Sequence, residues 1–175
     1  LTAANTYTGT TTVSYGILNI RNASALGATN GGTAVSSGGT LQLQGNVTVV
    51  GEALSLNGVG YAIGGALQNV SGDNTWTGTI TNSTAARINS DAGTLTLSGG
   101  IDATNKALTL GGAGNIVVSG AITNSTAGLN KDGVGVVTLS GANTYSGSTL
   151  ISAGTLQIGD GTDAGSIAAT SGWCR

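Results

Sequence analysis

The chain has 175 residues, a net charge of −2, 32 glycines and only 7% charged residues, against about 25% in ordinary globular domains. The absence of histidine removes the usual base of serine and cysteine catalysts, and an aromatic content of 3% excludes a core built on large rings. The five basic residues are scattered, which excludes the basic patch needed to bind nucleic acid or an anionic membrane.

Short runs of alternating apolar residues recur along the chain between glycine- and asparagine-containing segments. In chain order they are Leu18-x-Ile20, Leu41-x-Leu43, Leu54-x-Leu56, Leu95-x-Leu97, Leu108-x-Leu110, Val137-x-Leu139 and Leu156-x-Ile158. Such alternation is typical of β-strands with one buried side. We therefore expect an all-β protein with an aliphatic core and little or no α-helix.

Three internal repeats organise the chain. Residues 1–20 match 139–158 with 11 of 20 positions identical, residues 80–99 match 122–141, and residues 39–60 match 93–114. The offsets of 138, 42 and 54 are not multiples of one number, but they suit a coil of about 20 to 25 residues with variable turns. The repeats predict a single solenoid domain over 1–175 with about seven or eight rungs. The ending 168–175 departs from the pattern and is expected to form an irregular tail.

Some positions recur within the repeats and are candidate structural sites. They are Asn5, Tyr7 and Gly9, which recur as Asn74, Trp76 and Gly78 and as Asn143, Tyr145 and Gly147, and the corner glycines Gly39, Gly93 and Gly154. The asparagines suit either a positive-φ backbone or an interior amide ladder. The aromatic residues suit packing over a glycine corner or, alternatively, a ladder that stacks on carbohydrate, and their wide spacing favours packing. The corner glycines predict positive φ at positions with no room for a Cβ atom.

Few residues are left for catalysis or metal binding. Asp160 and Asp163 in the sequence GDGTDAG are the metal or catalytic candidates, although small acidic residues in such a sequence favour a surface turn. Lys131 and Asp132 are expected to form a solvated loop pair. Cys174 is the only cysteine, so it can form neither an internal disulfide nor a zinc cluster. We expect no cofactor and no enzymatic activity.

Residues 133–161, GVGVVTLSGANTYSGSTLISAGTLQIGDG, closely resemble the passenger-associated transport repeat of autotransporter proteins, with its pattern GTLTLSGxNTYTGxTTIxxGTLxLG. Residues 1–20 resemble the second half of that pattern, and residues 93–99 resemble the first half. The resemblance implies a right-handed, single-stranded parallel β-helix of the surface-adhesin type. It also implies a location outside the outer membrane of a Gram-negative bacterium, anchored at the cell surface or secreted.

Three functions compete on this basis. The first is a non-catalytic structural and adhesive stalk that aids folding of the passenger. Its partners would be other cell-surface or matrix molecules and, end to end, its own copies, without membrane insertion. The second is an ice-binding solenoid, suggested by Thr75-x-Thr77-x-Thr79 and Thr10-x-Thr12. The third is a polysaccharide-active enzyme, which would need several carboxylates on adjacent rungs.

Overall fold

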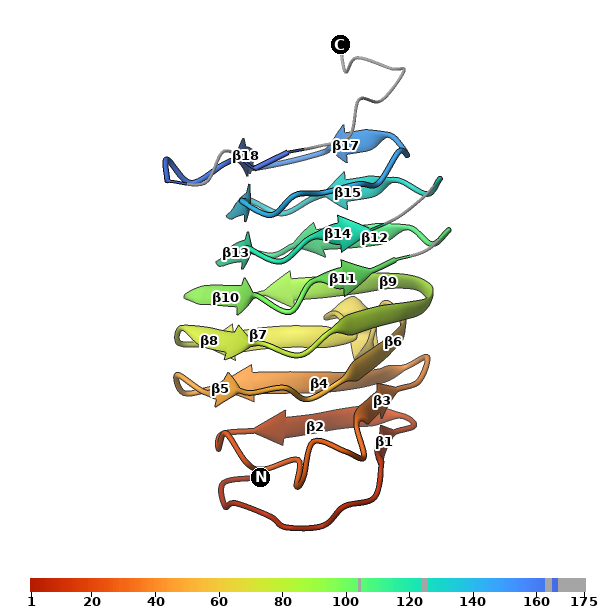
Figure 1. Ribbon diagram of the computed structural model, residues 1–175, viewed down its shortest axis with the longest axis vertical. Coiled ribbons are helices and arrows are strands. Elements are labelled where there is room, and N and C mark those ends of the chain that lie inside the picture. Colours follow the sequence, from red (N-terminus) through yellow and green to blue (C-terminus); the bar gives the residue numbers. More distant parts are fainter. Residues whose placement is uncertain (104, 124–125, 163–164, 167–175) are drawn as a thin grey trace.

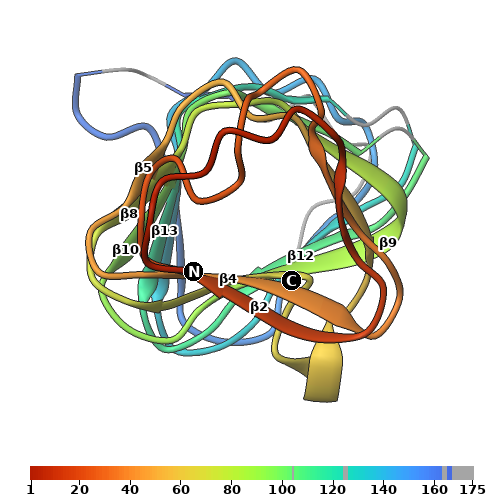
Figure 2. The same ribbon diagram turned by 90° about the horizontal axis from the view of Figure 1, so that it is seen from below.

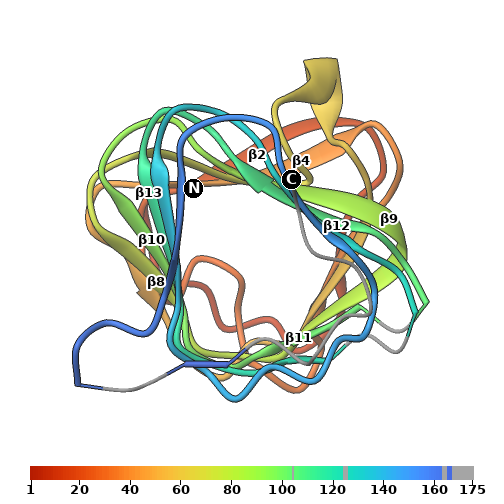
Figure 3. The ribbon, with the colours of Figure 1, turned by 90° about the horizontal axis from the view of Figure 1, so that it is seen from above.

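The chain coils into a β-solenoid of about seven turns (Figure 1). The computed structural model describes residues 1–103, 105–123, 126–162 and 165–166. The predicted tail 168–175 and the candidate Asp163 lie outside the described residues. Seen from the C-terminal end, the chain runs anticlockwise as it rises toward the viewer, which makes the coil right-handed (Figure 3). The predicted all-β, right-handed parallel solenoid is therefore confirmed.

Each turn passes over three faces. Face 1 contains β1 (Thr11–Val13), β3 (Thr33–Val35), β6 (Leu54–Gly58), the first part of β9 (Ile80–Ser90), β11 (Ile101–Asp102) and β14 (Ile122–Thr123). Face 2 contains β2 (Gly16–Ile20), β4 (Gly39–Gln44), β7 (Leu67–Ser71), the second part of β9, β12 (Leu108–Gly111), β15 (Leu129–Lys131) and β17 (Thr149–Ile151). Face 3 contains β5 (Thr48–Val49), β8 (Asn74–Trp76), β10 (Thr94–Leu97), β13 (Asn115–Val118), β16 (Val136–Leu139) and β18 (Thr155–Ile158).

All described strand pairs are parallel, so equivalent residues of successive turns stack in columns along the axis. Paired residues lie 19 to 28 positions apart in the sequence, from Val137 with Leu156 to Gly58 with Ala86. The predicted alternating segments all fall within strands. Variable corners therefore absorb differences in rung length without breaking the strand pairing. One helical element, η1 (Tyr61–Ile63), occurs in the described part of the chain.

The core is a set of aliphatic columns inside the coil. One column on face 2 contains Leu18, Leu41, Leu67, Ile88, Leu110, Lys131 and Ile151. One column on face 3 contains Val49, Trp76, Leu97, Val118, Leu139 and Ile158. Full burial of one such apolar side chain stabilises the fold by about 1.5–3 kcal/mol. The opening seen along the axis in Figure 2 is the space that these inward side chains occupy.

The three faces explain why the repeat offsets share no common period. An offset of 42 keeps the face, because Ile80 and Ile122 both lie on face 1 with Ile101 between them. An offset of 54 changes the face, because Leu54 lies on face 1 and Leu108 on face 2.

The largest offset, 138, also moves the repeat by one face. Thr11 is on face 1 and its equivalent Thr149 on face 2, while Leu18 is on face 2 and Leu156 on face 3. The repeat is thus a strand–corner–strand unit that fits more than one corner of the solenoid.

Candidate functional site

The recurring asparagines join neighbouring turns. The side-chain amide of Asn5 donates to the Ala25 carbonyl oxygen at 2.8 Å. The side-chain oxygen of Asn74 accepts from the Val47 amide at 2.6 Å, and that of Asn143 accepts from the Ile122 amide at 2.8 Å. None of the three asparagines has a positive φ. Their common role is therefore to bond the backbone of an adjacent rung.

The recurring aromatic residues do not share one environment. Trp76 and Tyr145 are fully buried, whereas Tyr7 is 41% exposed. Trp76 lies on face 3 between Val49 and Leu97. Tyr145 lies on another side of the coil, because the amide of the preceding Thr144 bonds to the carbonyl of Ile122 in β14. The rings of Trp76 and Tyr145 therefore pack in the core. Because they are buried, they cannot form a surface ladder that binds carbohydrate.

Each tyrosine of the repeat has a hydroxyl partner four residues later. The Tyr7 hydroxyl bonds to Thr11 Oγ1 at 2.6 Å, and the Tyr145 hydroxyl bonds to Thr149 Oγ1 at 2.9 Å. The residue four positions after Trp76 is Ile80, and the buried Trp76 Nε1 has no hydrogen-bond partner. Burial raises the pKa of Tyr145, and its bond to Thr149 partly opposes that shift.

The recurring glycines permit close approach of adjacent rungs. A Cβ atom at Gly78 would overlap the Glu52 carbonyl oxygen, and one at Gly147 would overlap the Ala127 carbonyl oxygen. Gly9, in the first turn, has nothing within 4 Å of the same position. The repeat therefore needs glycine where another rung lies against it.

The predicted positive φ is found at two of the three corner glycines. Gly93 and Gly154 have φ of 74° and 69°. The expectation of a positive φ was wrong for Gly39, because the neighbouring Gly38 takes the left-handed conformation with φ of 83°. Glycine still fits at position 39, since an added Cβ atom would overlap the Val13 carbonyl oxygen.

Substitution of Gly78 by alanine is expected to destabilise the solenoid by about 1–3 kcal/mol, because two rungs must separate to admit the methyl group. The matched control is Gly9→Ala, which changes the equivalent residue of a repeat where the space is open. Urea unfolding of both variants measures the difference. Equal midpoints for the two variants would contradict this account of the corner.

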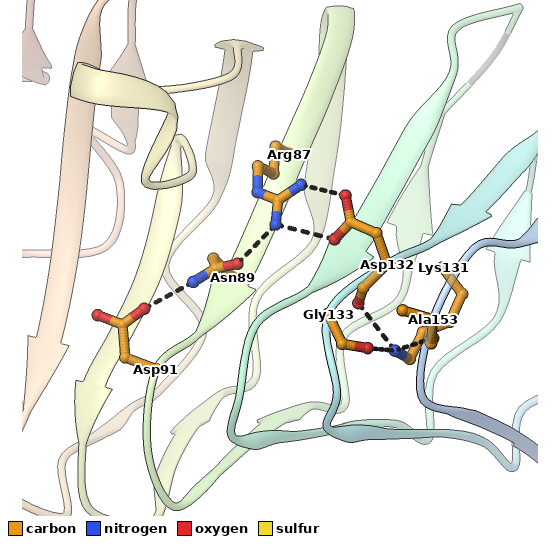
Figure 4. Close-up of polar contacts among 7 residues, drawn as sticks. All are labelled: Arg87, Asn89, Asp91, Lys131, Asp132, Gly133 and Ala153. Atoms are coloured by element: carbon orange, nitrogen blue, oxygen red, sulfur yellow. Dashed lines mark hydrogen bonds and ion pairs between the residues drawn. The ribbon is translucent and has the colours of Figure 1, made fainter.

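An ion pair crosses a full rung on face 2 (Figure 4). Arg87 donates from Nη1 and Nη2 to the two carboxylate oxygens of Asp132 at 2.6 and 2.9 Å. Gly111 of β12 leaves the space, because a Cβ atom there would overlap the Asp132 carboxylate. Arg87 Nη2 also donates to Asn89 Oδ1 at 2.9 Å, and Asn89 donates to Asp91 at 2.6 Å. A pair this exposed contributes about 1 kcal/mol or less.

Lys131 is buried, so the expectation of a solvated Lys131–Asp132 loop pair was wrong. Its side chain takes an inward position between Leu110 and Ile151. The ammonium group donates to the carbonyl oxygens of Asp132, Gly133 and Ala153 at 2.8, 2.8 and 3.0 Å (Figure 4). Burial lowers the pKa of Lys131, partly opposed by the charge of Asp132. Lys131 thus ties the corner after β15 to the corner after β17.

Glu52 is a second buried charged residue, only 2% exposed. Its carboxylate accepts a hydrogen bond from Thr33 Oγ1 at 2.8 Å. Burial raises the pKa of Glu52 above 4.5, and the Thr33 bond opposes part of the shift. The native state therefore retains the Glu52 proton over a pH range in which the unfolded chain has lost it.

Replacing Glu52 by glutamine is expected to stabilise the solenoid at pH 7. The protonated Glu52 side chain contributes its full stability below pH 4.5, the pKa of the unfolded chain. This contribution falls as the pH rises through the raised native pKa, because between the two pKa values the native state binds more protons than the unfolded state. Glutamine can still accept the Thr33 bond and carries no charge. Thermal unfolding of both proteins from pH 4 to pH 8 checks this, and a variant less stable than the wild type at pH 7 would contradict it.

The described acidic residues lie in separate parts of the solenoid and do not gather into a metal site. Asp160 is exposed, and its carboxylate accepts bonds from the Thr162 amide and hydroxyl at 2.9 and 2.7 Å, as in a turn. Asp73 accepts a bond from the Thr94 amide at 2.9 Å. Within the described residues no three acidic, histidine or cysteine side chains are placed to hold a metal ion. The described part also contains no helix long and apolar enough to cross a membrane.

Stacked parallel rungs, inter-rung asparagines and close-packed glycine corners define a right-handed parallel β-solenoid. Residues 1–20 and 129–158, less than a third of the chain, match the model of the passenger-associated-transport-repeat family. These two repeats and the β-solenoid fold suggest an autotransporter passenger stalk, and the repeat family implies a secreted or surface-exposed location. No curated protein and no solved structure matches the chain.

Proposed function

We propose that the chain is a non-catalytic structural and adhesive stalk segment of an autotransporter-like protein at the bacterial cell surface, outside the outer membrane. The observation that carries the proposal is the unbroken stacking of parallel rungs between two segments of the passenger repeat. Such a rod holds whatever it carries at a distance from its anchor and presents long surfaces for weak contacts repeated along its length.

The same stacking supports a role in folding of the passenger. Each rung offers a parallel strand edge on which the next rung can pair, so folding can propagate from one end of the chain. The asparagine bonds between rungs add contacts that form only when the next rung docks. Progressive folding of this kind would let a passenger leave the membrane one rung at a time.

The dispersed carboxylates support a role without catalysis, as opposed to a polysaccharide-active enzyme. The ice-binding alternative needs Thr-x-Thr on successive rungs. The outward column of face 3 contains Thr48, Thr75, Thr96, Val117 and Thr138, so Val117 interrupts it. Thr94-x-Thr96 lies beside Asn115-x-Val117, which lacks threonine. Neither alternative is favoured by a specific contact.

We also propose that copies associate end to end. Ile151 and Ile158, members of inward columns in β17 and β18, are 46% and 39% exposed. A second solenoid that stacks on these strands would cover both side chains. Sedimentation velocity from dilute to concentrated protein checks this, and a monomer at every concentration would contradict it.

The adhesive role is tested by display of the 175-residue chain on a non-adherent bacterium. We expect faster settling of the cells or increased attachment to at least one of plastic, matrix-coated and host-cell surfaces. Display of the Trp76→Ala variant at equal surface density is the control for dependence on the folded solenoid. Unchanged settling and attachment on all surfaces would contradict the adhesive role.

A further inference from the structure

A short loop projects from the wall of the solenoid at the corner between faces 1 and 2 (Figures 2 and 3). The loop, residues 59–65, contains η1 and lies between β6 and β7. The turn that includes it pairs Leu41 with Leu67, 26 residues later, whereas Leu67 pairs with Ile88 after 21. The extra residues of this turn therefore form a projecting loop and add nothing to the core.

The loop is closed at its base and holds a strained backbone. The Tyr61 amide donates to Thr40 Oγ1 at 2.8 Å, and Thr40 Oγ1 donates to the Gly65 carbonyl oxygen at 2.8 Å. Ala62 and Ile63 have φ of 49° and 65°, the left-handed region that β-branched residues rarely adopt. Strain of about 1–3 kcal/mol per residue persists only where the surroundings fix it, and it concentrates at binding sites.

Apolar and aromatic side chains are exposed on this projection and beside it. Tyr15, at the same corner two turns earlier, is 76% exposed, and Tyr61 is 42% exposed. Their rings meet edge to face with centroids 5.6 Å apart. Ile63 and Ile17 are 70% and 52% exposed. In a chain with six tyrosines and tryptophans, two of them form an exposed pair on the wall of the rod.

A row of amides runs along the axis next to this pair. Asn19 donates to Gln42 at 3.1 Å, Gln42 donates to Gln68 at 2.8 Å, and Gln68 donates to Asp91 at 2.7 Å. The loop touches the row, because a Cβ atom at Gly64 would lie 3.4 Å from the Gln68 amide.

Gln42 and Gln68 have hydrogen-bonding capacity to spare, whereas both amide hydrogens of Asn19 are used. A side-chain amide has two donors and two acceptor lone pairs, and each bond within the row uses one of them. Gln42 and Gln68 are only partly buried, so the remaining groups can reach a ligand. The row thus presents fixed, neutral donors and acceptors at the spacing of the rungs, about 4.8 Å.

We infer that Tyr15, Tyr61 and the row Asn19–Gln42–Gln68 form a binding site for a neutral polysaccharide chain that lies along the solenoid axis. Rigid aromatic rings supply apolar contact at low entropic cost, and a sugar ring offers a matching C–H face. Amides can both donate to and accept from hydroxyl groups. The rung spacing is close to the length of one sugar unit, so successive amides can meet successive sugars. A sulfated or phosphorylated ligand would need a cluster of basic residues, whereas the row has Arg21 bonded to Asn19 at one end, at 3.1 Å, and the carboxylate of Asp91 at the other.

This inference rests on the adhesive role proposed above and is tested with purified protein. Affinity gel electrophoresis of the full chain in gels containing mannan, xyloglucan or dextran is expected to show retardation by at least one of them. Heparin and alginate, which are acidic, are expected to cause none. The Tyr15→Ala/Tyr61→Ala variant is expected to weaken binding at least about tenfold, and Gln68→Ala several-fold.

The matched control is Val134→Ala, which removes another exposed apolar side chain, 76% exposed, from a distant corner. It should bind as the wild type does. Circular dichroism melts establish that each variant is folded. Absence of retardation by all three neutral polysaccharides, or unchanged retardation of the double variant, would overturn the site. If displayed cells still attach to protein-coated surfaces in that case, the adhesive role stands and only the polysaccharide site fails.

Discussion

Replacing Trp76 by alanine is expected to lower the free energy of unfolding by about 3–5 kcal/mol. The ring is fully buried in the face 3 column between Val49 and Leu97. The neighbouring side chains cannot close the cavity, because the strand pairing fixes the distance between rungs. Equilibrium unfolding in urea, followed by far-UV circular dichroism, measures the loss.

The position of Trp76 in the middle of the rod increases the effect. Each rung is stabilised by its neighbours, so a weakened central rung lowers the stability of both halves. Val134→Ala, at an exposed corner, is the control and should change the free energy by less than about 0.5 kcal/mol. A loss below about 1 kcal/mol for Trp76→Ala would show that the ring is not packed as described.

Replacing Lys131 by methionine is expected to cost about 2–4 kcal/mol, although methionine has a similar volume and no charge. The cost arises because the carbonyl oxygens of Asp132, Gly133 and Ala153 lose their shared donor, and an unpaired buried polar group costs about 1–3 kcal/mol. The exposed Lys106→Met is the control and should be close to neutral. Chemical unfolding of the two variants provides the comparison. A Lys131→Met protein as stable as the wild type would mean that water replaces the ammonium group without penalty.

The strands and their stacking could be predicted from the sequence because the Leu-x-Leu alternation reports directly which side chains face inward. Leu95 and Leu97, for example, lie in β10 with both side chains buried. The arrangement of the repeats could not be predicted in the same way. Similarity between Thr11 and Thr149 suggests equivalent places, whereas the variable corners move the second copy to another face.

The polar sites were harder to predict than the strands. The sequence predicts a loop for Lys131, yet its alignment with Leu110 in the pattern Leu129-x-Lys131 is a signal that it faces inward. The recurrence of Tyr7, Trp76 and Tyr145 leaves a carbohydrate ladder open as the alternative to packing. Three-dimensional packing decides which aromatic rings are buried. The exposed aromatic pair is instead Tyr15 with Tyr61, and neither tyrosine is one of the recurring aromatic positions. Nothing in the local sequence indicates that residues 59–65 leave the wall of the coil.

The measurement that tests the stacked-rung account most directly is a distance between spin labels at Thr48 and Thr138, in a protein whose Cys174 is replaced by serine. These residues lie in one outward column on face 3, with Thr75, Thr96 and Val117 between them. Four rung steps of about 4.8 Å predict a narrow backbone separation near 19 Å, although 90 residues separate the labels in sequence. A much longer distance, or the broad distribution of an unordered chain, would contradict the solenoid.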